Sequence, residues 1–218
     1  MRRNAKQQLA IAGGFFLAFA IFTALAAGFD VQPIGPEGSE VGFAAINQFV
    51  FQKLGMNLFW LRVTDYLGVF ALLVMAAFAV MGMIQLIRRR SIRKVDGSIL
   101  LLGALYALLA AFYGFFEVVV VNCRPVLVDG ILEASYPSSH TMLVICVMVS
   151  AADCIRLHVP ERKGLCIAAA AAVWIISAVA VVGRLLSGMH WFTDIAGGIL
   201  LSLALIFLYR AALSFMRK

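Results

Sequence analysis

The stretch YLGVFALLVMAAFAVMGMIQLI, residues 66–87, runs for 22 residues without a charged side chain. A helix of about 20 mostly apolar residues is long enough to cross a hydrocarbon layer about 30 Å thick. Arg88, Arg89 and Arg90 follow directly, and clustered basic residues are typical of the point where such a helix leaves the membrane on its cytoplasmic side. This stretch therefore predicts a transmembrane helix.

The rest of the chain has the same character. Hydrophobic residues make up 63% of the 218 residues and charged residues 13%, against about 45–50% and about 25% in soluble proteins. A soluble chain of this size could not bury so much apolar surface, so a soluble, disordered or fibrous chain and a nucleic-acid module are disfavoured. The four cysteines show no spacing typical of a disulfide framework or a metal site.

Six apolar segments predict an all-α fold: a polytopic bundle of six transmembrane helices with one interfacial helical segment, forming a single membrane domain over residues 1–218. The first apolar run is longer than the 7–15 residues of a signal peptide, so we expect it to be retained. The predicted spans cover about residues 9–28, 66–87, 99–121, 137–155, 165–182 and 190–209.

Basic residues are distributed unequally between the two sides of this layout. With the N-terminus inside, the outer side holds only four of the 18 basic residues, Lys53, Arg62, Arg124 and Arg184. Because basic residues accumulate on the cytoplasmic side, both termini are expected inside, and the net charge of +7 needs no nucleic-acid partner. The short loops and this bias favour a bacterial cytoplasmic membrane.

The stretch between the first two spans is too polar to cross a membrane and too apolar to float in water. Its residues 41–62 set Asn47 and Lys53 among aromatic and aliphatic side chains. An interfacial helix with Trp60 near the headgroups fits this composition. A loop packed on the bundle fits it about equally well.

Polar residues gather in three stretches on the predicted outer face: NCRPVLVDG (122–130), YPSSH (136–140) and GRLLSGMHWFTD (183–194). Together they hold two of the three histidines and two of the four outer basic residues. A single histidine at a span end is more often an interfacial residue than a catalyst. The coincidence of all these groups predicts a functional site.

YPSSH has the form of a helix N-terminus. Pro137 suits the first helical position, where its missing N–H costs nothing. The free N–H groups of Ser138, Ser139 and His140 would then favour an anion. A plain N-terminal cap is the better explanation of the serines alone. The titratable ring of His140 shifts the balance toward an anion site, because it can donate a proton to a leaving group.

His190 and Asp194 are four residues apart, so on a helix they share one face. A carboxylate that accepts a bond from one imidazole nitrogen leaves the other nitrogen as nucleophile or base. A pair that only caps the last span is the alternative. Arg124 and Arg184 supply planar forks that suit phosphate oxygens, or they anchor the chain to headgroups.

The three stretches resemble the motifs of the type 2 phosphatidic acid phosphatases, membrane lipid phosphatases related to bacterial acid phosphatases and vanadium haloperoxidases. The family motifs are lysine, six residues and Arg-Pro; Pro-Ser-Gly-His; and Ser-Arg, five residues, His, three residues and Asp. The resemblance covers about residues 117–194. The matching residues are Arg124-Pro125, Pro137-Ser138-Ser139-His140 with serine for glycine, and Gly183-Arg184 with His190 and Asp194, with glycine for serine.

This resemblance implies metal-independent hydrolysis of a lipid phosphate monoester or lipid pyrophosphate at the outer face, without a cofactor. It implies that His190 attacks phosphorus to form a phosphohistidine and that Asp194 orients its ring. His140 would protonate the leaving group and then activate water. The residues implied to hold the phosphate are Arg124, Arg184, Ser138 and Ser139.

Glu117 departs from the family, which has lysine at this position. At about 5 Å a carboxylate would repel a phosphate by roughly 3 kcal/mol. Glu117 could turn aside and pair with Arg124 or Arg184, or Lys53 or Arg62 could take over the cationic role. The site could also bind without turnover, or recognise a headgroup that carries an amine.

Two alternatives to hydrolysis follow. One is a catalytically weak relative that binds, senses or translocates lipid phosphates, and the other is a lipid phosphotransferase that shares the phosphohistidine. A small transporter would need polar residues at mid-membrane depth, where the spans are poor in them. The sequence leaves the lipid and the oligomeric state open.

Overall fold

The computed structural model describes residues 2–216, and this part of the chain forms α-helices and two short 3-10 turns, with no strand. Every α-helix except α2 is long and apolar enough to span a membrane, which confirms the predicted all-α fold with six spans. The elements are α1 (Arg2–Gly28), η1 (Pro36–Gly38), α2 (Ala44–Leu54), α3 (Leu58–Arg89), η2 (Ile92–Lys94), α4 (Gly97–Val118), α5 (Ser139–His158), α6 (Lys163–Leu186) and α7 (Phe192–Met216).

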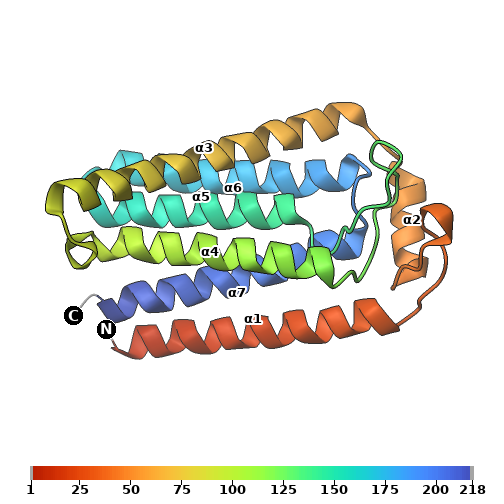
Figure 1. Ribbon diagram of the computed structural model, residues 1–218, viewed down its shortest axis with the longest axis horizontal. Coiled ribbons are helices and arrows are strands. Elements are labelled where there is room, and N and C mark those ends of the chain that lie inside the picture. Colours follow the sequence, from red (N-terminus) through yellow and green to blue (C-terminus); the bar gives the residue numbers. More distant parts are fainter. Residues whose placement is uncertain (1, 217–218) are drawn as a thin grey trace.

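The six long helices lie side by side in one bundle, and α2 lies across one end of it (Figure 1). α1 begins and α7 ends at the opposite end of the bundle (Figure 1). In the most apolar stretch of α5, 50% of the residues are buried inside the protein, against 6% in α6. α5 is therefore the central helix, and α6 lies at the periphery.

The outer surface of the bundle is apolar. Large side chains such as Leu73, Ile167 and Trp174 are exposed on it. An apolar surface that covers most of a helical bundle is stable only where lipid replaces water around it. The protein is therefore an integral membrane protein.

The predicted interfacial segment, residues 41–62, divides between two helices. α2 ends at Leu54, and α3 begins at Leu58 because the Asn57 side chain accepts hydrogen bonds from the N–H groups of Phe59 (3.0 Å) and Trp60 (3.3 Å). Such a side-chain cap starts a helix. Residues from Leu58 onward thus belong to a spanning helix.

Tyr136 fixes the start of α5 against α7. Its ring lies so close to Gly197 that a Cβ there would come within 2.6 Å of it, and its hydroxyl hydrogen bonds with Thr23 of α1 (2.8 Å). The ring also stacks on Phe19. These contacts hold the segment that follows Tyr136 in place at the end of the bundle.

Candidate active site

The three polar stretches converge on one cavity of about 450 Å³, which we call the polar chamber. It lies where α4, the loop 119–138, the start of α5 and the turn 187–191 meet, at the end of the bundle that carries α2 (Figure 1). The sequence analysis predicted that several of these residues come together. Its polar lining includes Glu117, Arg124, Glu133, Ser139, His140 and His190.

The ring of His190 is held at both nitrogens. Its Nδ1 lies 3.1 Å from the carbonyl oxygen of Ser135, which can only accept, so Nδ1 carries the proton. Its Nε2 lies 3.5 Å from Nη1 of Arg124, which can only donate. The Nε2 lone pair therefore faces Arg124 in the chamber, in the form that a nucleophile needs.

The buried position of His190 also determines its charge. The residue is 3% exposed, and burial lowers its pKa from 6.5 to about 4, although the Asp194 carboxylate acts in the opposite direction. At neutral pH the imidazole is therefore uncharged and its lone pair is available.

Asp194 holds the turn that carries His190. This fully buried carboxylate accepts hydrogen bonds from the N–H of Trp191 (2.9 Å) and from Nδ2 of Asn122 (3.1 Å). Its Oδ2 lies 3.6 Å from Nδ1 of His190. Asp194 thus caps the start of α7 and lies beside the ring of His190, which comes before the helix and not on it as expected.

A buried polar network supports this turn from behind. The amide of Asn47 on α2 donates to the hydroxyl of Thr193 (2.9 Å) and accepts from the Thr193 N–H (3.2 Å). The network therefore fixes α2 to the start of α7. The sequence analysis placed Asn47 in an interfacial helix but found no partner for it.

The ring of His140, in the first turn of α5, is also held at both nitrogens. Nη2 of Arg184 lies 3.1 Å from its Nδ1, so Nδ1 accepts and Nε2 carries the proton. That Nε2 lies 3.5 Å from Oδ1 of Asp65 on α3. The sequence analysis missed Asp65; the available signal was a carboxylate within the first turns of an otherwise apolar spanning helix.

Arg184 is almost fully buried at 3% exposure. Its Nη1 donates to Asp65 (2.9 Å) and to the hydroxyl of Thr64 (3.1 Å). Arg184 contacts His140, which lines the chamber, but is not itself among the described residues that line it. The structure thus brings Arg184 next to the predicted proton donor.

The predicted helix start at Pro137 is wrong. α5 begins at Ser139, and Ser138 is its N-cap, whose hydroxyl accepts from the N–H of Thr141 at 3.5 Å. The Ser138 N–H is not free, because it donates to the Asp194 carbonyl (2.9 Å). The structure therefore buries Ser138 beneath the site, while Ser139 lines the chamber.

Glu117 is exposed and lines the chamber, and within residues 2–216 it forms no ion pair with Arg124 or Arg184, which was one of the open explanations. Arg124 pairs instead with Glu133, with 2.9 Å between Nε and Oε2, and Arg184 pairs with Asp65. Neither Lys53 nor Arg62 is among the described residues that line the chamber. The segment 41–62 thus brings no basic side chain to the position beside Glu117 where the resembling family has lysine.

Comparison with known proteins agrees with this geometry. Residues 118–217 match the family model of the PAP2 superfamily, a region that contains Arg124, His140, Arg184, His190 and Asp194. The search of curated proteins gives no match.

The fold is similar to the crystal structure of the first transmembrane PAP2 type phosphatidylglycerolphosphate phosphatase from Bacillus subtilis, with a TM-score of 0.66 and 19% sequence identity. The similarity covers 95% of this chain and 98% of that one. Residues 118–217 are thus similar to the PAP2 superfamily, and the chain shares its transmembrane fold with a PAP2 type phosphatase.

Proposed function

We propose that the protein hydrolyses a lipid phosphate monoester or lipid pyrophosphate. The family and the similar phosphatase structure support a phosphatase activity. The observation that carries the lipid assignment is a second cavity of about 490 Å³ between α3, α4 and α5, which we call the apolar groove. It shares Tyr113, Ser139, His140 and Met142 with the polar chamber.

The two cavities fit the two halves of a lipid phosphate. The groove is lined mainly by apolar side chains, among them Val69, Leu72 and Leu109, and it lies between the spanning helices. A phosphate in the chamber would therefore leave its hydrocarbon chain in the groove, next to the bilayer.

The reaction begins with attack on phosphorus by Nε2 of His190. A P–N bond forms and the bond from phosphorus to the leaving oxygen breaks, while His140, which has taken up a second proton at Nδ1 from solvent, gives that proton to the leaving oxygen. Nδ1 of the new phosphohistidine keeps its proton, which it donates to the Ser135 carbonyl, beside Asp194. His140, now neutral, removes a proton from water. The water oxygen attacks phosphorus and the P–N bond breaks, which releases phosphate and regenerates His190.

The charge that spreads over the phosphoryl oxygens in these steps needs fixed donors. Arg124 lies against the attacking nitrogen, and Ser139 lines the chamber at the N-terminus of α5. The chain would supply the stabilising charge through guanidinium and helix N–H groups, so we propose a reaction that needs no metal.

The distribution of basic residues supports a site on the outer face of a bacterial cytoplasmic membrane, with both termini inside. The chamber lies at the end of the bundle opposite to the start of α1 (Figure 1). A phosphatase placed there acts on lipids of the outer leaflet.

A second candidate function rests on the carboxylates of the chamber. Glu117 and Glu133 both line it, and Glu133 pairs with Arg124. This negative charge favours a weak enzyme that binds or senses lipid phosphates. Transfer of the phosphate to another lipid would use the same phosphohistidine.

Phosphate release by the purified protein in detergent with EDTA tests the proposal, with a panel of lipid monophosphates and pyrophosphates. We expect turnover by the wild type and none by His190→Ala. His158→Ala is the matched control, because that histidine lies at the far end of α5, on the Cys154 carbonyl. A folded wild type that releases no phosphate from any lipid would contradict hydrolysis and favour the binding function.

A further inference from the structure

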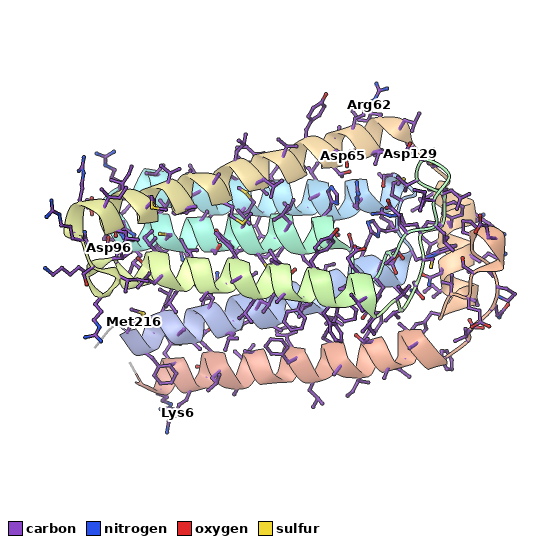
Figure 2. All side chains as sticks on the ribbon, viewed as in Figure 1. Lys6, Arg62, Asp65, Asp96, Asp129 and Met216 are labelled. Atoms are coloured by element: carbon purple, nitrogen blue, oxygen red, sulfur yellow. The ribbon has the colours of Figure 1, made fainter. Side chains whose placement is uncertain are left out.

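Asp65 connects two groups of the site from outside the matched motif region. Its Oδ1 lies 2.9 Å from Nη1 of Arg184 and 3.5 Å from Nε2 of His140. The side chain is half-exposed and lines the apolar groove. Figure 2 shows Asp65 on the part of α3 nearest the loops of the site.

Two glycines allow α3 to come this close. A Cβ at Gly183 would lie 2.9 Å from both Thr64 and Trp60, and a Cβ at Gly68 would lie 3.1 Å from Cδ2 of His140. The family carries serine at the position of Gly183. The glycine found here leaves room for α3 to pack on α6, and this packing brings Asp65 to Arg184.

The site therefore holds two units of the same composition, each with one histidine, one aspartate and one arginine. In the His190 unit, one ring nitrogen lies 3.6 Å from Asp194 and the other 3.5 Å from Arg124. In the His140 unit the corresponding distances are 3.5 Å to Asp65 and 3.1 Å to Arg184. The units differ in which nitrogen faces the carboxylate: Nδ1 in the first and Nε2 in the second.

Asp65 also determines which edge of Arg184 stays free. Asp65 and Thr64 occupy both protons of Nη1. The Nε–H of Arg184 is buried and has no hydrogen-bond partner among the described residues. A buried donor without a partner is destabilising, and a phosphate oxygen is an acceptor that would satisfy it.

We propose that Asp65 is a positioning residue for the reaction, an inference that rests on the proposed phosphatase function. Asp65 holds Nε2 of His140, so that Nδ1 is the nitrogen that exchanges a proton, and it holds Nη1 of Arg184, so that the Nε edge is left for phosphate. When phosphate takes the Nη2–H of Arg184, Nδ1 is free to accept a proton from solvent. That proton then goes to the leaving oxygen, while Nε2 keeps its own proton, which faces Asp65.

The leaving group distinguishes positioning from plain packing. A nitrophenolate leaves without a proton, whereas the alkoxide of a long-chain alkyl phosphate needs one. In single turnovers with excess enzyme, we expect Asp65→Asn to slow release of the alkyl alcohol by about 10²-fold and release of nitrophenolate by less than about fivefold. Equal losses for the two esters, or no loss, would overturn the inference.

Two further variants complete the test. Asp153→Asn is the matched control, because Asp153 pairs with Arg210 in an equivalent ion pair far from the site, and we expect wild-type rates. If Asp65→Asn does not fold, Asp65→Glu tests the positioning role in its place, because glutamate keeps the negative charge but moves the carboxylate away from His140 and Arg184. A loss confined to the alkyl ester supports positioning, and wild-type rates or equal losses refute it.

Orthovanadate separates a failure of this inference from a failure of the proposed function. Its binding is measured as a rise in melting temperature, which needs no turnover. We expect a rise for the wild type and a smaller rise for Asp65→Asn. Equal rises overturn the role of Asp65, whereas a wild type that binds vanadate but hydrolyses no ester overturns only the hydrolysis.

Discussion

The two histidine units of the chamber share a composition but differ in their surroundings. His190 and Asp194 have side chains that are 1% and 0% exposed, while those of His140 and Asp65 are 32% and 50% exposed. The first unit is enclosed by the turn before α7, and the second lies where the chamber joins the groove. Burial suits a nucleophile that must stay neutral and fixed, and exposure suits a group that must exchange protons with water.

The largest predicted effect separates the two histidines. We expect His190→Asn to abolish turnover, by more than about 10⁴-fold, because the nucleophile is lost. His140→Asn removes a general acid, which contributes about 10²–10⁴-fold. With nitrophenyl phosphate, His140→Asn should still release up to one nitrophenolate per enzyme, because only the second step strictly needs its base. A burst from the His190 variant instead would reverse the assignment.

The next prediction concerns the carboxylate of the buried unit. Asp194→Asn exchanges an acceptor oxygen for an amide, so either the Trp191 N–H or Nδ2 of Asn122 loses its bond. Burying an unpaired donor costs about 1–3 kcal/mol, and loss of the orienting carboxylate lowers turnover by about 10³–10⁴-fold. Melting temperature and phosphate release measure the two effects. If stability is unchanged, the buried unit is not held as described.

A smaller effect appears in the pH dependence of stability. The pKa of His190 is about 6.5 in the unfolded chain and about 4 in the fold. Between these values the unfolded chain binds the extra proton, so stability falls as the pH falls from 6.5 toward 4, by about 2 kcal/mol at pH 5. We expect the melting temperature of His190→Gln to drop less between pH 7 and pH 5 than that of the wild type. Parallel curves would show that His190 is not buried as a neutral ring.

The smallest effect is expected at the mouth of the chamber. Glu117→Lys replaces a repulsive charge by an attractive one at an exposed position, where solvent weakens electrostatic interactions. We expect about a tenfold lower inhibition constant for inorganic phosphate and little change in kcat. A large rise in kcat would instead identify Glu117 as the reason for a weak enzyme.

The spanning helices, and the closeness of His190 to Asp194, could be predicted from sequence because the signals for both lie within short segments. Residues 66–87 carry an uninterrupted apolar run, and His190 and Asp194 are close in sequence, so a short turn joins them. The motif spacing also places Arg124 and His140 correctly on the chamber.

The remaining parts depend on contacts between distant segments. Asp65 reaches Arg184 across 119 positions of sequence, and only the packing of α3 on Gly183 brings them together. Ser138 was placed wrongly because the group that takes its N–H, the Asp194 carbonyl, lies on another helix. A sequence pattern alone predicts neither the packing of α3 on α6 nor that of the start of α5 on α7.

The place of the groove between the spanning helices α3, α4 and α5 has a consequence for kinetics. A lipid substrate that reaches the groove from the surrounding bilayer diffuses in the plane of the membrane and does not pass through water. Its effective concentration is then a mole fraction of the surrounding lipid, so added detergent or inert lipid would slow the reaction by surface dilution at constant bulk concentration. Apparent Michaelis constants for this protein should therefore be expressed per membrane area and not per volume.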